Sequence, residues 1–243
     1  MAEESTRINK YISSSGFCSR RQADEYIRSR QVTIDGEIAE MGSQVLPGQT
    51  VLVCGKPVVP SEQRILIAFH KPLGITCTTD TRDPDNIIDF IGYPTRIFPI
   101  GRLDKNSSGL ILLTNDGDIV NRLLRAEGRH DKEYVVTVDR PIDPGFKNNM
   151  EKGVPILDTV TLPCKVQITG KSTFHIILNQ GLNRQIRRMC EYFGYRVRKL
   201  KRIRILNISL GALPVGEYRK LNAKEMKDLM AILDRGQRNT KEN

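Results

Sequence analysis

The chain has 243 residues, of which 39% are apolar and 27% charged, so it can build a sizeable core and is neither fibrous nor disordered. It carries 38 basic and 28 acidic side chains, a net charge of +10, which favours a polyanionic partner over a merely solvated basic surface. Apolar runs fall short of the roughly 20 residues of a membrane helix, so we expect no membrane partner. The polar, acidic start does not resemble a signal peptide, and five cysteines without a CxxC pair indicate reduced thiols in a cytoplasmic protein.

The first sixty residues have the pattern of a small separate unit. Arg7–Ser14 predicts a short helix, and a capping box formed by Ser19 and Gln22 opens a second one. Residues 32–38 predict a hairpin, because their Asp-Gly pair supplies the two positive-φ positions of a tight turn. Residues 55–61 are interpreted as a linker. These features place a domain at residues 1–62 and a second at 63–243.

The larger domain predicts a mixed arrangement of strands and helices. Its strand candidates are 65–69, 97–100, 110–113, 134–138, 173–178 and 195–205. Its helix candidates are 87–91, 118–126, 183–193 and 223–234. Strands outnumber long helices and do not alternate strictly with them. This order favours an α+β fold with a mostly antiparallel sheet over a doubly wound fold.

A polar loop at 101–117 separates two apolar strand candidates and holds a candidate catalytic carboxylate. Asp104 stands between Arg102 and Lys105, and neighbouring cations favour the ionised form that a nucleophile needs. An ordinary turn aspartate with surface ion pairs would show the same local pattern. Local features alone leave both interpretations open and favour the turn.

The helix candidate at 183–193 combines an apolar face with a basic one. The apolar residues follow i, i+3, i+4, i+7 spacing and predict a buried face: Ile186, Met189, Cys190 and Phe193. Asn183 is the candidate N-cap. Arginines beside a helix N-terminus suit phosphate: Arg184, Arg187 and Arg188.

The strand candidate at 195–205 continues this basic region. Between Arg184 and Arg204 the chain carries nine basic residues and one acid, Glu191. Period-two alternation predicts that four arginines share one strand face: Arg196, Arg198, Arg202 and Arg204. Such a face repels itself unless an anion binds it, so we expect RNA there.

Several motifs resemble known RNA-modifying enzymes. Residues 7–12, 16–24 and 32–36 (RINKYI, GFCSRRQAD, VTIDG) are similar to the S4-like, or alpha-L, RNA-binding domain. Residues 101–117 (GRLDKNSSGLILLTNDG) resemble the catalytic motif of RNA pseudouridine synthases. HKPLG at 70–74 and GLNRQIRRM at 181–189 resemble motifs that flank it in that family. The motifs occur in the family's order and cover nearly the whole chain, and they resemble its RsuA-like branch and within it the large-subunit synthase F group.

The resemblance implies an isomerase that converts uridine to pseudouridine without cofactor or metal. It makes Asp104 the catalytic aspartate, Tyr134 the active-site tyrosine that stacks on a flipped base, and Arg184 the basic partner of Asp104. Implied or candidate RNA-binding residues are Arg102, Leu103, Lys105, Gln185, Ile186, Arg187, Ile205, Leu206 and Asn207, together with Arg7, Lys10, Arg20 and Arg21 in the N-terminal domain.

The group implies 23S rRNA, in its domain V, as partner, and a tRNA anticodon stem-loop as a second one, with the protein acting as a monomer. Two alternatives stay open at this point. A non-catalytic RNA-binding ribosome assembly factor would bind RNA without isomerising it. A glycosidase-like enzyme would need a second catalytic carboxylate, and the sequence offers no obvious candidate for it.

Overall fold

The computed structural model describes residues 5–124 and 130–241, with side chains to residue 235. Two compact units make up the chain. The first comprises the residues up to Ile65 with Pro94–Ile97 and Asn115–Gly117, and the second comprises the remainder. Within the described ranges, no helix is long and apolar enough to span a membrane.

The first unit packs two short helices with small sheets. Its elements are β1 (Thr6–Arg7), α1 (Ile8–Ser14), α2 (Arg20–Arg28), β2 (Val32–Ile34), β3 (Glu37–Ile38), β4 (Gln44–Val45), β5 (Val51–Val53) and β6 (Lys56–Val58). β1 pairs with β4, and the other strands follow the order β3-β2-β5-β6. Apolar helix positions such as Ile12, Ala23 and Ile27 are buried against these strands.

Local sequence signals set this unit, with one exception. The Ser19 hydroxyl accepts from the Gln22 amide while Gln22 reaches back, so the predicted capping box is confirmed. Asp35 and Gly36 take φ of 50° and 90°, as the predicted hairpin turn requires. The linker expected at 55–61 is wrong, because β6 pairs with β5 there and buries Val58.

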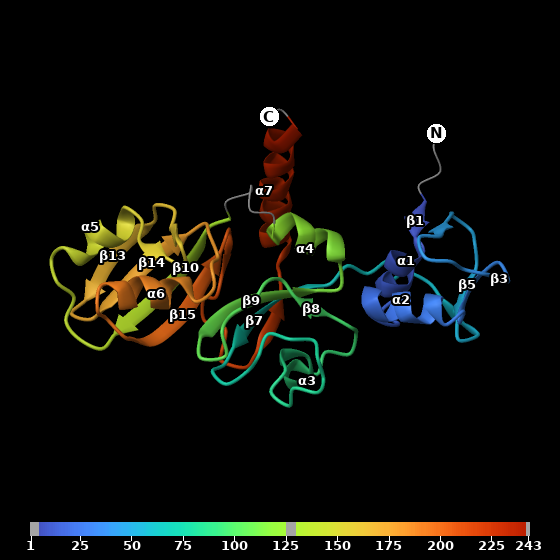
Figure 1. Cartoon of the computed structure of the whole chain (residues 1–243), viewed down its shortest axis with the longest axis horizontal. Helices are drawn as coiled ribbons and strands as arrows, with labels where there is room; N and C mark the ends of the chain where they lie inside the picture. The colour runs from blue at the N-terminus through green and yellow to red at the C-terminus, as the bar shows by residue number, and fades with distance from the viewer. Residues whose placement is uncertain (1–4, 125–129, 242–243) are drawn as a thin grey trace. The chain divides into compact units, whose positions relative to one another are not determined.

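The second unit is an α+β domain around one large sheet (Figure 1). Its strands are β7 (Leu66–Lys71), β8 (Phe98–Pro99), β9 (Ser108–Thr114), β10 (Lys132–Val138), β11 (Pro155–Ile156), β12 (Thr159–Val160), β13 (Lys165–Gly170), β14 (Thr173–Leu178), β15 (Val197–Ile205), β16 (Ile208–Ser209) and β17 (Tyr218–Lys220). Its helices are α3 (Ile87–Ile91), α4 (Gly117–Leu124), α5 (Phe146–Glu151), α6 (Gln185–Tyr192) and α7 (Ala223–Lys241).

In the described part of the chain the sheet has nine strands, ordered β13-β14-β10-β15-β9-β7-β17, with β16 and β8 on β15 and β9. The pairings are antiparallel except that of β15 with β9, which is parallel. A mostly antiparallel sheet is therefore confirmed. The β9–β15 junction lies in the middle of the sheet and brings the loop before β9 beside the strand that follows α6.

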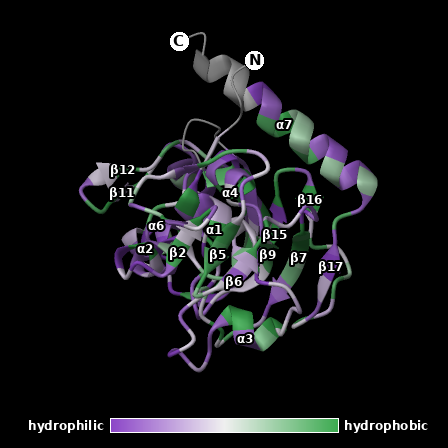
Figure 2. Cartoon of the chain, turned by 90° about the vertical axis from the view of Figure 1, so that its right-hand side faces the viewer, coloured by the Kyte–Doolittle hydropathy of each residue, from purple (hydrophilic) through white to green (hydrophobic). Residues whose placement is uncertain are grey.

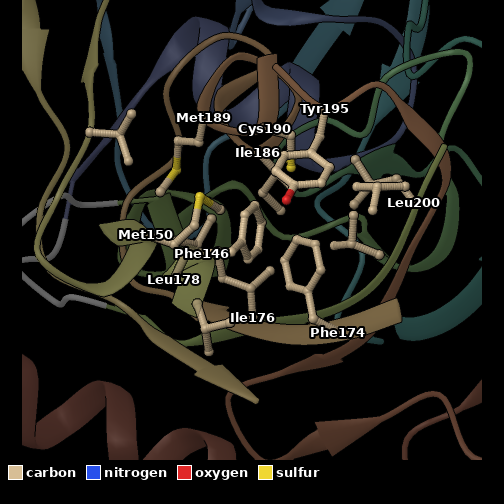
Figure 3. Close-up of a cluster of buried hydrophobic side chains, with 14 of the residues drawn as sticks. Phe146, Met150, Phe174, Ile176, Leu178, Ile186, Met189, Cys190, Tyr195 and Leu200 are labelled. Carbon is tan, nitrogen blue, oxygen red and sulfur yellow. The ribbon is translucent and has the colours of Figure 1, made fainter. Parts of the chain in front are cut away.

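Two apolar cores flank this junction. In one, α5 and α6 cover β10, β13, β14 and β15, and the ring of Phe146 lies 5.0 Å from the ring centroids of Phe174 and Tyr195 (Figure 3). Ile186, Met189 and Cys190 are buried there, so the predicted apolar face of α6 is confirmed. In the other core, Leu229 and Leu233 of α7 are buried with residues of β7 and β9. Apolar residues recur along this helix among polar ones (Figure 2).

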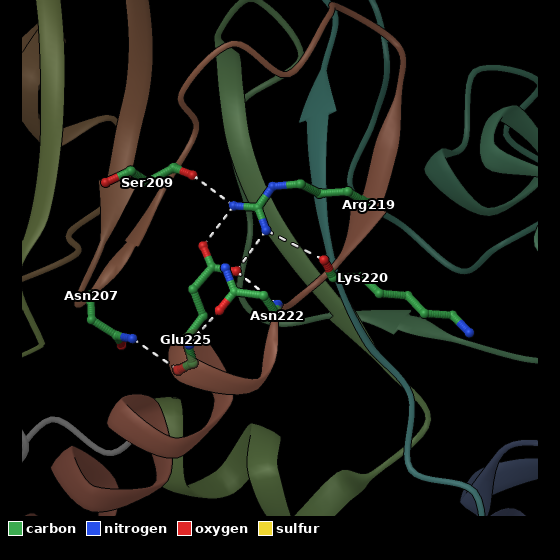
Figure 4. Close-up of polar contacts among 6 residues, drawn as sticks. All are labelled: Asn207, Ser209, Arg219, Lys220, Asn222 and Glu225. Carbon is green, nitrogen blue, oxygen red and sulfur yellow. Dashed lines mark hydrogen bonds and ion pairs between the residues drawn. The ribbon is translucent and has the colours of Figure 1, made fainter.

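A polar cluster fixes the start of α7 (Figure 4). Arg219 donates two bonds of 2.7 Å to the two carboxylate oxygens of Glu225. Asn222 caps the helix by accepting from the Glu225 amide at 2.8 Å. The Asn207 side chain donates to the Glu225 carbonyl at 2.9 Å. The turn after β15 is thereby tied to the C-terminal helix.

Candidate active site

A cavity of about 600 Å³ opens within the second unit where β9, β10, β15 and the start of α6 meet. Its wall brings together eight residues that the sequence had selected: Arg102, Leu103, Asp104, Tyr134, Arg184, Gln185, Ile186 and Ile205. Segments separated by up to a hundred positions in the chain thus converge on one space. The cavity is large and polar enough to receive a nucleoside, and a carboxylate faces it.

Asp104 is held by the backbone of its own loop. Its carbonyl accepts from the Ser107 amide at 2.9 Å, and the Leu103 amide contacts the Cys77 sulfur at 3.4 Å. Burial raises the pKa of that Cys77 thiol, so it acts as a neutral packing group. The Asp104 side chain is 34% exposed. The backbone at Asp104 is therefore fixed, and its carboxylate remains accessible.

Arg187, on the first turns of α6, is the arginine of the described residues that pairs with this carboxylate. Its Nε lies 3.9 Å from Asp104 Oδ2, and its Nη2 donates to the Asn106 carbonyl at 2.6 Å and to Ser107 Oγ at 3.1 Å. Burial lowers the Arg187 pKa, and Asp104 opposes that shift. Arg187 thus contacts Asp104 and the two residues that lie just before β9.

Arg184 was expected to pair with the Asp104 carboxylate, but the structure places Arg187 beside that carboxylate. The expected N-cap, Asn183, is also displaced, because α6 begins at Gln185 with Arg184 as its N-cap, at φ 49°. The Arg184 side chain is exposed on the cavity wall, and among the described residues the recorded ion pair of Asp104 is with Arg187. The N-cap thus lies one residue later than expected, and the arginine beside Asp104 is the one three positions further along the chain, Arg187.

Lys71, at the end of β7, is completely buried beneath the Asp104 loop. Its Nζ donates to the carbonyls of Pro72 at 2.8 Å and Ile75 at 2.7 Å. Burial lowers the Lys71 pKa, while the Asp104 carboxylate favours its protonated form. This lysine orders the loop that supports Leu103.

Tyr134 and Arg202 are cross-strand partners on the cavity side of β10 and β15. The expectation that Arg196, Arg198, Arg202 and Arg204 share one strand face is wrong. Between Tyr134–Arg202 and Glu133–Arg204 the register shifts by one residue, because Ile203 is an extra residue on β15. Arg202 is 4% exposed on the cavity side, whereas Arg204 pairs with Glu133 on the opposite face at 2.8 Å.

Gly109 permits the close approach of β9 to β15. It has a φ of +114°, and a Cβ there would lie 2.2 Å from the Arg202 carbonyl oxygen. Only glycine fits this position. The glycine of the GRLDKNSSG segment is thus required by backbone packing beside Arg202.

The remaining selected residues lie outside the cavity wall. Lys105 donates to Asp85 at 2.7 Å, Leu206 packs in the α7 core, and the Asn207 amide is used by Glu225. In the first unit the side chains of three selected arginines are exposed and that of Lys10 is half-buried. The exposed ones are Arg7, Arg20 and Arg21.

Sequence reasoning did not assign site roles to Lys71, His130 or Lys132, and it placed Arg202 on an RNA-binding strand face and not in the cavity. Lys71 lies inside the HKPLG segment, and Lys132 stands two residues before Tyr134, so proximity to the recognised motifs was an available signal. His130 and Arg202 line the cavity through tertiary packing and through the bulge, neither of which leaves a mark in the sequence.

This fold and site belong to a defined class of enzyme. The model of the RNA pseudouridylate synthase family matches residues 65–192, and that of the S4 domain matches residues 6–51. The chain belongs to the RNA pseudouridine synthase family and is an enzyme that isomerises uridine to pseudouridine in RNA. The resemblance seen in the sequence is confirmed.

Individual relatives narrow the comparison. The chain is 53% identical over 236 residues to the dual-specificity RNA pseudouridine synthase RluF of Escherichia coli K12, covering 96% of this chain and 81% of that one. It is 34% identical to the ribosomal large subunit pseudouridine synthase B of Bacillus subtilis 168, covering 95% and 98%. A crystal structure of a pseudouridylate synthase matches with a TM-score of 0.68 at 28% identity, covering 92% and 99%.

Proposed function

We propose that this enzyme modifies a specific uridine in domain V of 23S rRNA, and that a tRNA anticodon stem-loop is a second substrate. The similarity to a dual-specificity RNA pseudouridine synthase over almost the whole chain supports two RNA substrates. The similarity to a ribosomal large subunit synthase supports the ribosomal one.

The observation that carries the mechanism is the accessible Asp104 carboxylate, held 3.9 Å from Arg187 at the wall of a nucleoside-sized cavity. In the proposed reaction Asp104 is the nucleophile, and Tyr134 stacks on the extruded uracil. Base extrusion costs a few kcal/mol of stacking, which an aromatic ring in the cavity partly returns. Arg187 orients the carboxylate, and Arg184, with Arg102, contacts RNA phosphate at the exposed wall.

The first sixty residues are proposed to add RNA affinity. We place the domain boundary after residue 62, and the exposed Arg7, Arg20 and Arg21 are candidates for phosphate contacts, as is Lys10. The protein is proposed to act as a monomer in the cytoplasm, where its ribosomal substrate is made.

Mapping pseudouridines in 23S rRNA and tRNA from cells that lack the protein tests this proposal. One missing site in each RNA is expected, and each should reappear when the purified protein is incubated with unmodified transcripts of that RNA. An unchanged map would show that the enzyme modifies neither of these RNAs in the cell.

A further inference from the structure

The cavity wall holds more positive charge than its carboxylate can balance. Among the described residues that line it, Asp104 is the only acid, while four are cationic: Arg102, Lys132, Arg184 and Arg202. Arg102 and Arg184 are exposed, so water screens them. Arg202 and Lys132 are largely withdrawn from water and need another explanation, because an uncompensated buried charge is costly.

Arg202 retains an unused donor inside the cavity wall. Its Nε donates to the Leu110 carbonyl at 2.7 Å, which fixes the guanidinium. Its Nη2 is buried, and no acceptor in the described structure lies within hydrogen-bond distance of it. The guanidinium carbon lies 6.0 Å from the centroid of the Tyr134 ring. A fixed, nearly buried donor beside the proposed stacking residue is the arrangement expected where a ligand supplies the missing acceptor.

Lys132 adds a second cation to the same wall. Its Nζ donates to the His130 carbonyl at 3.1 Å, which occupies one of its three donors. Burial lowers the Lys132 pKa, and the positive charge of Arg202 lowers it further, with only Asp131 acting in the other direction. The two neighbouring cations repel each other, and the wall around them is partly buried. An anion placed between them therefore stabilises both.

His130 adds an unpaired hydrogen-bond acceptor, its Nδ1, to the same wall. Its Nε2 lies 3.1 Å from the Arg122 carbonyl and must donate to it, so a neutral ring presents Nδ1 as an acceptor. Nδ1 is buried and has no partner in the described structure, and His130 lines the cavity. The wall therefore offers unfilled donors and an unfilled acceptor. The edge of uracil offers the complement, with two carbonyl oxygens and one N–H between them.

We infer that Arg202 and Lys132 bind the carbonyl oxygens of the extruded uracil and stabilise the negative charge that the base acquires when its bond to the sugar breaks; this rests on the proposed function. When the bond between N1 and C1′ breaks, the electron pair remains on uracil and is shared by O2 and O4. Donors already in place at those oxygens stabilise this state more than the neutral nucleoside. After the base turns, C5 of the uracil anion attacks C1′ and displaces the Asp104 carboxylate. The C5 proton then leaves and N1 takes up a proton from water, which gives the neutral product ring.

The test uses full-length protein and an unmodified transcript of 23S rRNA, at enzyme concentrations that saturate the RNA. Arg202→Gln and Lys132→Met should each lower the single-turnover rate about 100-fold, the usual effect of removing one donor to a developing anion. The RNA dissociation constant should stay within about threefold, because phosphate contacts dominate affinity. Lys165→Met, at an exposed position of β13, is the matched control and should change neither quantity.

A second substrate separates charge stabilisation from a structural effect. In a transcript made with 5-fluorouridine the departing base is a more stable anion, because fluorine withdraws electron density. Its cleavage should depend less on the two cations, so the deficits measured by loss of the parent nucleoside should shrink at least tenfold. Wild-type rates in either variant, or equal deficits on both transcripts, would overturn the inference.

If Arg202→Gln does not fold, as judged by its thermal transition, Lys132→Met alone decides. Pseudouridine formation by the wild-type protein tests the proposed function separately. A wild-type protein that forms no pseudouridine in the transcript would count against the 23S rRNA substrate, whereas active wild type with unaffected variants would count against the cationic wall alone.

Discussion

The two faces of β10 and β15 differ in whether their charged side chains are paired. On the face away from the cavity, Glu133 accepts from Arg204 at 2.8 Å and contacts His175 at 3.1 Å, so each charged group has a partner. On the cavity face, Arg202 keeps an unpaired Nη2, and the carboxylate of Asp104 lies 3.9 Å from Arg187. We call the paired group of Glu133, Arg204 and His175 the closed cluster. The charged groups on the cavity side, which retain an unpaired donor, form an open one.

This difference separates charged groups that stabilise the fold from charged groups that are available to bind a substrate. A paired cluster recovers its desolvation cost within the protein, whereas an unpaired buried donor costs free energy until a ligand fills it. Natural proteins retain such costs mainly at functional sites. Substitutions on the two faces should therefore separate stability from activity.

The largest effect is expected at Asp104. Asp104→Asn keeps the size of the side chain but removes the nucleophilic charge, so pseudouridine formation should fall more than about a thousandfold. RNA affinity should stay within a few fold, because phosphate contacts dominate it. Nucleoside analysis of the RNA after incubation measures the first and a filter-binding titration the second. Turnover close to wild type would remove Asp104 from the mechanism.

Gly109→Ala should break the junction that positions Arg202. The new Cβ would meet the Arg202 backbone, and the positive φ adds strain, so we expect a loss of about 3 kcal/mol in the free energy of unfolding. Urea denaturation measures it. Gly211→Ala is the matched control, since Gly211 also has a positive φ, of 56°, but open space around it, and should cost about 1 kcal/mol. Equal losses would show that the close approach is not limiting.

Glu133→Gln should weaken the closed cluster by about 1 kcal/mol of unfolding free energy and leave the isomerisation rate within about twofold. Burial raises the Glu133 pKa, but hydrogen bonds from Arg204 and His175 outweigh it, so the folded pKa lies below the ordinary 4.5. The stabilisation is therefore complete above pH 4.5 and is lost as the pH falls through the folded value.

Thermal melts of wild type and Glu133→Gln across this acid range check that dependence. The difference between the two proteins should be largest near neutral pH and shrink as the wild-type carboxylate becomes protonated. A gap that stays constant down to the most acidic sample would assign the effect to packing.

The smallest effect is expected at Lys105, whose exposed pair with Asp85 contributes little to stability. Lys105→Ala should change the free energy of unfolding by less than about 0.5 kcal/mol. If Lys105 contacts a phosphate, RNA binding should weaken and the slope of log affinity against log salt should fall by about one. An unchanged slope would remove Lys105 from the RNA contacts.

Elements with strong local signals were predictable from the sequence. The bounds of α3 and β14 were predicted to the residue, because an Asn cap and clear alternation define them. β13 and α5 were missed. β13 is a sheet-edge strand whose residues are mostly exposed, and α5 is a six-residue helix, so neither carries a strong periodic pattern.

The site was predictable only as far as motifs reach. Asp104, Tyr134 and Arg184 line one cavity as the motifs suggested, yet the arginine beside Asp104 is Arg187, which the motifs did not single out as its partner. Arg202 and Arg204 lie on opposite faces of the strand because of a β-bulge, and strict period-two alternation does not predict a bulge. Helix starts and bulges are set by tertiary packing, which a single sequence does not reveal.

The extra residue in β15 has a consequence for how this strand tolerates change. Because Ile203 is the unpaired residue, a one-residue deletion there would remove the bulge and leave Arg202 opposite Tyr134 and Arg204 opposite Glu133 on a regular ladder. By contrast, a one-residue deletion in a regularly paired part of the strand would turn every residue on one side of the deletion to the opposite face. Ile203 is therefore a position where this strand can lose length without exchanging the arginine that faces the cavity for the one that pairs with Glu133.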